Sequence, residues 1–153
     1  TLNPLDGLGE IKRRLNVPLL VVDSVASVGA VPIKGDEWNI DIVMGGSQKA
    51  LSAPPCMGFA SVSPRAWEEI RAARYQGYAS FLQFDSPKDG ASFPYTPFRQ
   101  GTAALDEAVS ILLEAGMENV CARPEAVSRR CCEGVEGLGM ELFTRQGDIN
   151  SHS

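Results

Sequence analysis

Histidine is almost absent from this sequence of 153 residues, which has His152 alone, close to the C-terminal end. A Ser-His-Asp triad, a Cys-His pair or a histidine-rich zinc site would therefore have little to build on. The four cysteines form no Cys-x-x-Cys pair, and adjacent Cys131 and Cys132 are more easily interpreted as helix residues than as a disulfide framework. We therefore expect reduced thiols and a functional site without metal.

Basic residues are also in short supply, because 14 lysines and arginines stand against 19 acidic residues and give a formal net charge of -5. Nothing in this composition resembles the basic stripe that a nucleic acid or an anionic membrane attracts. The apolar runs are too short to span a bilayer, and the first residues lack the pattern of a signal peptide. We expect a cytoplasmic protein without nucleic acid or membrane partners. A peroxisomal or mitochondrial location of the parent protein is the alternative, since this segment contains no visible targeting signal.

The first half of the chain has the pattern of an α/β fold. Residues 4–15 carry apolar side chains at helical spacing, and residues 19–22 form a continuous apolar strand. A second strand at 40–44 completes a βαβ-like unit if the two strands are parallel. Pro54 and Pro55 leave no room for a crossover helix before the apolar residues 59–62. The third strand is therefore expected to be antiparallel to the second.

The second half is expected to be mainly helical. Its predicted elements are helices over 64–74, from Thr102 to Gly116 and over 118–136, and a short strand over 140–144. Ser63 is the expected cap of the first helix and Thr102 that of the second, Gly77 ends the first, and Pro124 kinks or restarts the third. Residues 78–100 are irregular and aromatic, and loops of this length are commonly functional or lie at an interface.

Residues 41–51 bring one lysine, Lys49, off the end of the second strand through a turn of small residues. Gly45 and Gly46 permit a positive φ or a close backbone approach. An amine held in such a turn can be partly desolvated, which favours the neutral, nucleophilic form that a Schiff base requires. Asp23 ends the first strand, so parallel strands would put both residues where open α/β sheets bind ligands. Composition alone leaves simpler interpretations open: a solvated loop lysine, and a helix cap or turn at Asp23.

Two segments carry a family resemblance: Val21 to Ser27, and Asp41 to Pro55. Their residues and their separation closely resemble the class V pyridoxal-phosphate-dependent aminotransferases, above all the alanine–glyoxylate and serine–pyruvate branch. Tyr95-Thr96-Pro97 and the following helices occur in the same order, so the resemblance covers essentially the whole chain. It implies the aspartate aminotransferase-like fold type I, with a mostly parallel sheet. Residues 1–115 would be the C-terminal half of the large domain, and 116–153 the interdomain helix and the start of the small domain.

The resemblance also implies roles for single residues. Lys49 would form the Schiff base with pyridoxal 5'-phosphate and move the substrate α-proton, and Asp23 would pair with the protonated ring nitrogen. Val25 would pack against the ring, and Gln48 would reach the phosphate or its neighbourhood. Thr96 would touch the phosphate of the neighbouring subunit, which implies a homodimer with shared active sites. Taken singly, Val25 could be core, Gln48 a turn residue and Thr96 a cap.

The sequence departs from the family in two ways. Cys56 stands where the family usually has glycine, so that turn is expected to differ or to carry strain. The family's phosphate cup and the arginine that grips the substrate carboxylate lie outside these residues, so we expect an internal fragment, inactive alone.

The function that this resemblance favours is transamination from alanine or serine to glyoxylate or pyruvate. The alternatives are a class V lyase or desulfurase, whose members usually have histidine where this chain has Gln48, and a catalytically silent interaction module.

Overall fold

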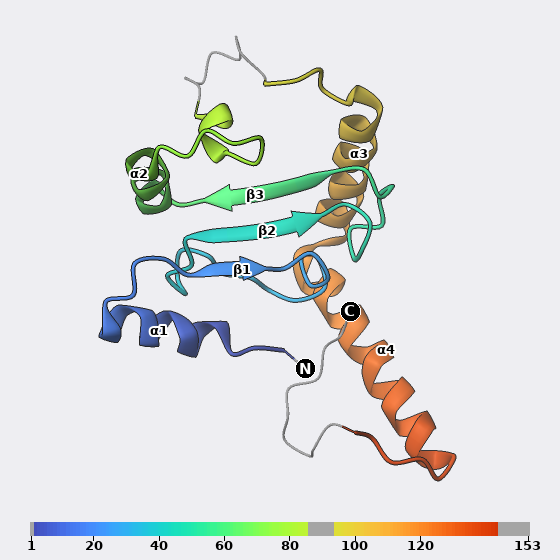
Figure 1. The fold of residues 1–153 in the computed structure, drawn as a ribbon. Coiled ribbons are helices and arrows are strands. Elements are labelled where there is room, and N and C mark those ends of the chain that lie inside the picture. The colour runs from blue at the N-terminus through green and yellow to red at the C-terminus, as the bar shows by residue number, and fades with distance from the viewer. Residues whose placement is uncertain (1, 86–93, 144–153) are drawn as a thin grey trace.

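The computed structural model describes residues 2–85 and 94–143 and contains a sheet of three strands in the order β1-β2-β3 (Figure 1). β1 (Val21–Asp23) runs parallel to β2 (Ile42–Gly46), and β3 (Gly58–Val62) runs antiparallel to β2. The helical elements are α1 (Leu5–Leu15), α2 (Pro64–Ala73), the short 3-10 helix η1 (Phe81–Phe84), α3 (Arg99–Ala115) and α4 (Met117–Gly137). The α/β class and both predicted strand directions are confirmed.

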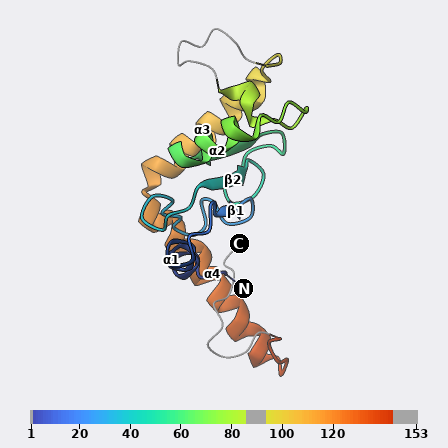
Figure 2. The same ribbon diagram turned by 60° about the vertical axis from the view of Figure 1, so that its left-hand side comes forward.

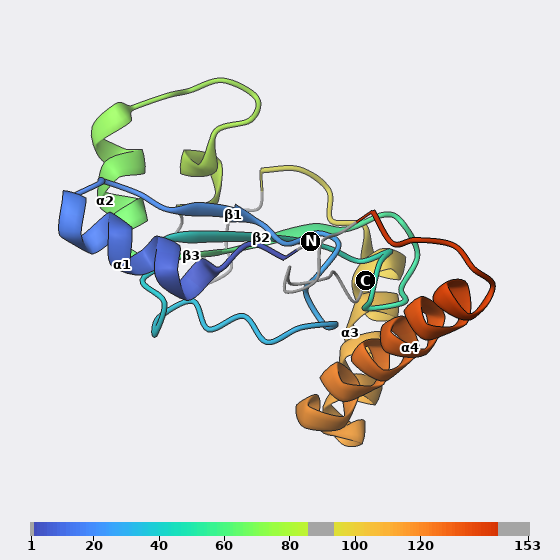
Figure 3. The same ribbon diagram turned by 90° about the horizontal axis from the view of Figure 1, so that it is seen from below.

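The helices lie around this small sheet rather than on one side of it. α1 lies beside β1 and α2 beside β3, whereas α3 and α4 lie towards the end of the sheet where β1 and β2 finish (Figures 1 and 3). Figure 2 shows α4 leading away from the sheet. No helix within residues 2–85 and 94–143 is long and apolar enough to cross a membrane.

The first two strands begin and end later in the chain than predicted. β1 starts at Val21 instead of residue 19, and β2 continues through Gly45 and Gly46, which the sequence analysis assigned to the turn. Neither glycine has a positive φ. Gly45 instead permits a close approach, because a Cβ added there would lie 2.2 Å from the ring of Phe59 on β3. The glycines therefore extend the strand, since their pairing with β3 outweighs their turn propensity.

The connection from β1 to β2 contains no helix, which corrects the βαβ-like expectation. Residues 24–31 form successive turns, in which Val28 N donates to Ser24 O at 2.8 Å and Val31 N to Ser27 O at 3.1 Å. Gly29 has a φ of 87° in this stretch. The small residues and this left-handed glycine favour turns over a continuous helix.

Several helix boundaries also differ from the prediction. α2 is capped by the hydroxyl of Ser63, as predicted, but ends at Arg74, whose φ is 50°, before Gly77 is reached. α3 begins at Arg99, and Thr102 lies inside it, where its hydroxyl donates to Phe98 O at 3.1 Å. Threonine forms local hydrogen bonds to the backbone both at a helix cap and inside a helix, so the sequence alone did not distinguish the two positions.

The last predicted elements differ as well. α4 continues through Pro124 without a new start, whereas the kink that was the other expected outcome stays a prediction. Residues 140–143 form no strand, since nothing in the described chain pairs with them; Thr144 lies outside the described residues.

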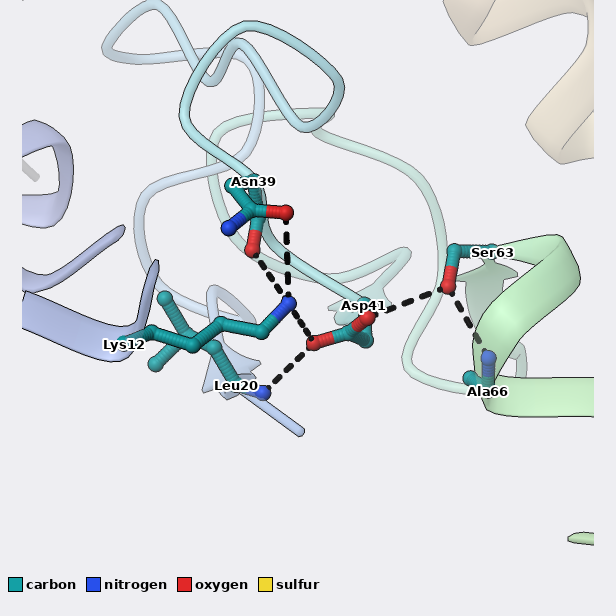
Figure 4. A network of polar contacts seen from close by, with 6 residues as sticks. All are labelled: Lys12, Leu20, Asn39, Asp41, Ser63 and Ala66. Carbon is teal, nitrogen blue, oxygen red and sulfur yellow. Dashed lines mark hydrogen bonds and ion pairs between the residues drawn. The ribbon is translucent and has the colours of Figure 1, made fainter. Parts of the chain in front are cut away.

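A buried ion pair joins the elements at the amino ends of the strands (Figure 4). Lys12 Nζ on α1 lies 2.5 Å from Asp41 Oδ2, and the two side chains are 3% and 4% exposed. Lys12 Nζ also donates to the carbonyl of Asn39 at 2.9 Å. Asp41 accepts hydrogen bonds from Leu20 N at 2.7 Å and from the hydroxyl of Ser63 at 3.3 Å. One carboxylate therefore links α1, the entry to β1, the entry to β2 and the cap of α2.

The surroundings of Asp41 act on its pKa in opposite directions. Burial alone raises the pKa, but the hydrogen bonds from Lys12, Leu20 N and Ser63 and the charge of Lys12 lower it by more. The pKa of Asp41 therefore lies below the ordinary value of 3.8. The folded protein therefore stabilises the ionised form of the Asp41 carboxylate.

Candidate functional site

The parallel register of β1 and β2 determines which side chains share a face at the carboxyl ends of the strands. Asp23 is paired with Met44, so these two residues project to the same face, and Gly46 follows two residues later on that face. A Cβ added to Gly46 would lie 2.8 Å from Oε1 of Gln48 and 3.0 Å from Cγ1 of Val25. The side chains of Val25 and Gln48 therefore lie directly against the buried backbone of Gly46, and we call these three residues the Gly46 cradle.

Asp23 lies at the edge of this cradle as an exposed carboxylate. Its Oδ1 accepts a hydrogen bond from Val25 N at 2.9 Å, which fixes the carboxylate relative to the turn. Its Oδ2 accepts no hydrogen bond from any residue in the described part of the chain. Asp23 also lines an open cavity of about 690 Å³ together with Ser27 and with Cys121 of α4. The free oxygen is available to a cation or to an N–H donor.

Lys49 lies in the loop of residues 47–57, which follows β2 directly. The loop is closed on itself, because Ser47 N donates to Met57 O at 3.0 Å and Ala53 N donates to Ser47 O at 2.9 Å. The side chain of Lys49 is exposed. The described residues therefore do not supply the desolvation that was predicted for the amine of Lys49.

Thr96 is not brought together with these residues within one chain. It is exposed and lies in the segment that leads into α3. Figure 1 shows that segment beyond β3, at the opposite edge of the sheet from β1. The segment and the strand that ends at Asp23 thus lie on opposite sides of β2 and β3.

Cys56 does not carry the left-handed strain that was one of the two outcomes expected from the missing glycine; the other, a turn that differs from the family's, stays a prediction. Its φ is not positive, whereas Ser52 earlier in the same loop has a φ of 58°. Its sulfur lies 2.9 Å from where a Cβ on Gly101 of α3 would be placed. A thiol therefore fits at this turn because α3 presents a glycine to it.

The sequence places the hydroxyl of Ser47 beside Lys49, but it did not predict the burial of Ser47 or of a second serine, Ser24. Ser47, directly before Gln48, is completely buried. Ser24, directly after Asp23, is 1% exposed, and its hydroxyl has no hydrogen-bond partner among residues 2–85 and 94–143. Burial of a serine has no periodic signal in these short turns, so the sequence offered no sign of either.

Comparisons with known proteins agree on one family. The family model of Aminotransferase class-V matches residues 1–149. Alanine–glyoxylate aminotransferase of Oryctolagus cuniculus is 36% identical over 152 residues, and serine–glyoxylate aminotransferase of Arabidopsis thaliana is 34% identical over 139 residues. These alignments cover 94% and 88% of this chain.

The fold agrees with solved structures of the same kind. Pyridoxamine–pyruvate aminotransferase from Mesorhizobium loti superposes with a TM-score of 0.88 at 29% identity, over 99% of this chain and 40% of that one. The chain spans 38% of the rabbit relative's length and 34% of the Arabidopsis one. It belongs to the class V aminotransferases, the family whose cofactor is pyridoxal 5'-phosphate.

Proposed function

We propose that the protein transfers an amino group from a small amino acid, alanine or serine, to glyoxylate or pyruvate. The names of its relatives support these substrates. The structural observation that carries the proposal is the Gly46 cradle at the carboxyl ends of β1 and β2. There Asp23, Val25 and Gln48 share one face, and Lys49 is the next residue along the chain.

The side chains at the cradle fit the chemical groups of pyridoxal 5'-phosphate. The amine of Lys49 can bond to its aldehyde. The free oxygen of Asp23 can accept a hydrogen bond from its protonated ring nitrogen. The branched apolar side chain of Val25 suits a ring face, and the amide of Gln48 can donate to a phosphate oxygen. Because Gly46 has no Cβ, the side chains of Val25 and Gln48 can both lie against its backbone.

Each of these residues has a distinct task in the proposed reaction. When bound, the cofactor accepts electrons from the substrate α-carbon as its proton leaves. Lys49 would hold the cofactor by its aldehyde until the substrate's amino group displaces it, and the amine so freed would then move the substrate α-proton. The Asp23 carboxylate keeps a proton on the ring nitrogen, Val25 packs against the ring, and Gln48 orients the phosphate.

We further propose that the chain is the internal part of a longer polypeptide that acts as a homodimer. Its share of the relatives' length supports the first point. The position of Thr96, exposed and beyond β3, supports a contribution to the neighbouring subunit's site. In this arrangement residues 1–115 belong to the large domain, and residues 116–153 begin the small one. Sequencing the coding region on both sides and measuring the mass in solution test these points.

A single half-reaction tests the function. Cofactor-loaded full-length protein is mixed with alanine or serine without an oxo acid, and the released oxo acid is measured. We expect one equivalent per site, with conversion of the cofactor to its aminated form, which glyoxylate then reverses. Sulfide released from cysteine would indicate a desulfurase instead, and an unchanged cofactor would indicate a silent module.

Filling the cradle is expected to weaken cofactor binding. In Gly46→Ala the added methyl group displaces Val25 or Gln48, and overpacking of this kind costs about 1–3 kcal/mol. Cofactor affinity measured by fluorescence titration should fall by about 10-fold or more, since tenfold corresponds to 1.4 kcal/mol. Gly58→Ala is the matched control, because its nearest atom lies 4.0 Å away. Equal affinity of both variants would contradict the cradle as a binding surface.

Neutralising Asp23 is expected to slow chemistry more than binding. In Asp23→Asn the amide still accepts from Val25 N but no longer holds a proton on the ring nitrogen. Single-turnover α-proton removal should slow by about 10²-fold or more, with KM changed by less than about 3-fold. Stopped-flow measurement with α-deuterated substrate checks this. An unchanged single-turnover rate would remove Asp23 from the mechanism.

A further inference from the structure

We propose that Ser47 is the positioning residue for Lys49, acting through the hydrogen bonds of its buried hydroxyl. The inference rests on the proposed role of Lys49 and adds a residue that acts on the amine without touching the cofactor.

Ser47 is completely buried and uses every hydrogen-bonding group it has. Its hydroxyl donates to Pro54 O at 2.5 Å and accepts from Met57 N at 3.1 Å and from Cys56 N at 3.4 Å. Its backbone N and O bond to Met57 and Ala53. Ser47, at the start of the loop, thus forms hydrogen bonds with four residues on the far side of the loop, Ala53, Pro54, Cys56 and Met57.

The sequence of that far side explains why a hydroxyl is needed. Pro54 and Pro55 have no backbone N–H, so the segment cannot join the β2–β3 ladder before Gly58. The Met57 amide would then lack a partner, and the Pro54 carbonyl would keep only the hydrogen bond that it accepts from Cys56 N at 2.8 Å; unpaired backbone groups near a buried residue are costly. The Ser47 hydroxyl supplies both at once, because it can donate one hydrogen bond and accept two.

Lys49 depends on this arrangement for its direction. Its side chain is exposed, so packing does not fix it; the loop backbone does. Ser47 and Ala53 are hydrogen-bonded on either side of Lys49, and within that span Ser52 N donates to Lys49 O at 2.9 Å. A shift of about 1 Å at a reacting group can lower a rate by about 10²-fold. Loss of the Ser47 hydroxyl would therefore displace the Lys49 amine and slow the steps in which that amine takes part.

The test uses variants that separate the hydroxyl from side-chain volume. Ser47→Ala removes the hydroxyl, whereas Ser47→Thr and Ser47→Val add the same bulk and differ only in the hydroxyl. Ser52→Ala is the control in the same loop, because its hydroxyl is exposed and lies 3.5 Å from Ala50 O. In cofactor-free full-length protein the rate of covalent cofactor attachment to Lys49 is followed by borohydride trapping and peptide mass spectrometry, and kcat and KM are measured on the loaded enzyme.

We expect Ser47→Ala to slow attachment and to lower kcat by about 10- to 100-fold, with little change in KM. Ser47→Thr should be faster than Ser47→Val by about 10-fold in both rates, even if both are less stable, and Ser52→Ala should match the wild type. Equal attachment rates for the threonine and valine variants would overturn the inference. If wild-type Lys49 itself captures no cofactor, the proposed function fails instead, so the two failures are distinguishable.

Discussion

Lys49→Ala is expected to abolish covalent attachment of the cofactor and to lower the transamination rate by at least about 10³-fold. The variant removes the amine that holds the aldehyde and the base that moves the α-proton, and general acid–base catalysis alone contributes about 10²–10⁴-fold. The visible absorption of the loaded protein should no longer respond to borohydride, and no peptide with residues 47–57 should carry the cofactor mass.

Two further variants make this result specific. Lys49→Arg retains the positive charge but cannot bond to the aldehyde in the same way, so it should be as inactive as the alanine variant. Lys34→Ala removes an exposed lysine that forms an ion pair with Glu37 at 2.9 Å, and should behave like the wild type. A borohydride-sensitive signal that survives in Lys49→Ala would assign the covalent bond to another amine.

Breaking the Lys12–Asp41 pair is expected to have the largest effect on stability. Lys12→Met retains most of the side-chain volume but leaves the Asp41 carboxylate buried without its cation. Losing one partner of a buried ion pair costs about 3–5 kcal/mol, which is a large part of the stability of an ordinary domain. Urea unfolding followed by tryptophan fluorescence measures the effect, since Trp38 adjoins Asn39 of the same network.

The exposed pair between Lys34 and Glu37 provides the comparison. Their side chains are 51% and 67% exposed, so Glu37→Gln should change the free energy of unfolding by less than about 1 kcal/mol. Equal effects of Lys12→Met and Glu37→Gln would show that burial adds nothing to the Lys12–Asp41 interaction.

The same network gives stability a defined pH dependence. Because the pKa of Asp41 in the folded protein lies below its ordinary value of 3.8, its contribution is fully present above about pH 5. It is lost as the pH falls through 3.8 and then through the lower folded pKa, below which the carboxylate is protonated in both states. The difference in unfolding free energy between wild type and Asp41→Asn should therefore be constant from about pH 6 to 8 and shrink below about pH 4.

The sequence predicted the elements that depend on local pattern. Apolar periodicity located α1 and the strands, and Ser63-Pro64 located the start of α2. The double proline predicted the antiparallel return of β3. Strand ends were less accurate, because Gly45 and Gly46 have turn propensity in the sequence but pair with β3 in the fold.

The candidate site was predictable only where residues follow a strand end. Asp23 and Lys49 were identified in this way, and the parallel register places their strands side by side. Lys12, Ser47 and Ser24 were not, because a buried polar residue is recognisable only from its partners. Lys12 resembles any charged residue of an amphipathic helix until Asn39 and Asp41 are found beside it.

β2 is tied down at both of its ends. The Asp41 carboxylate fixes the residue before it, and the hydroxyl of Ser47 fixes the residue after it. The backbone that leads to Lys49 thus has little conformational entropy left to lose when a ligand arrives, and such preorganisation converts more of the contact energy into affinity.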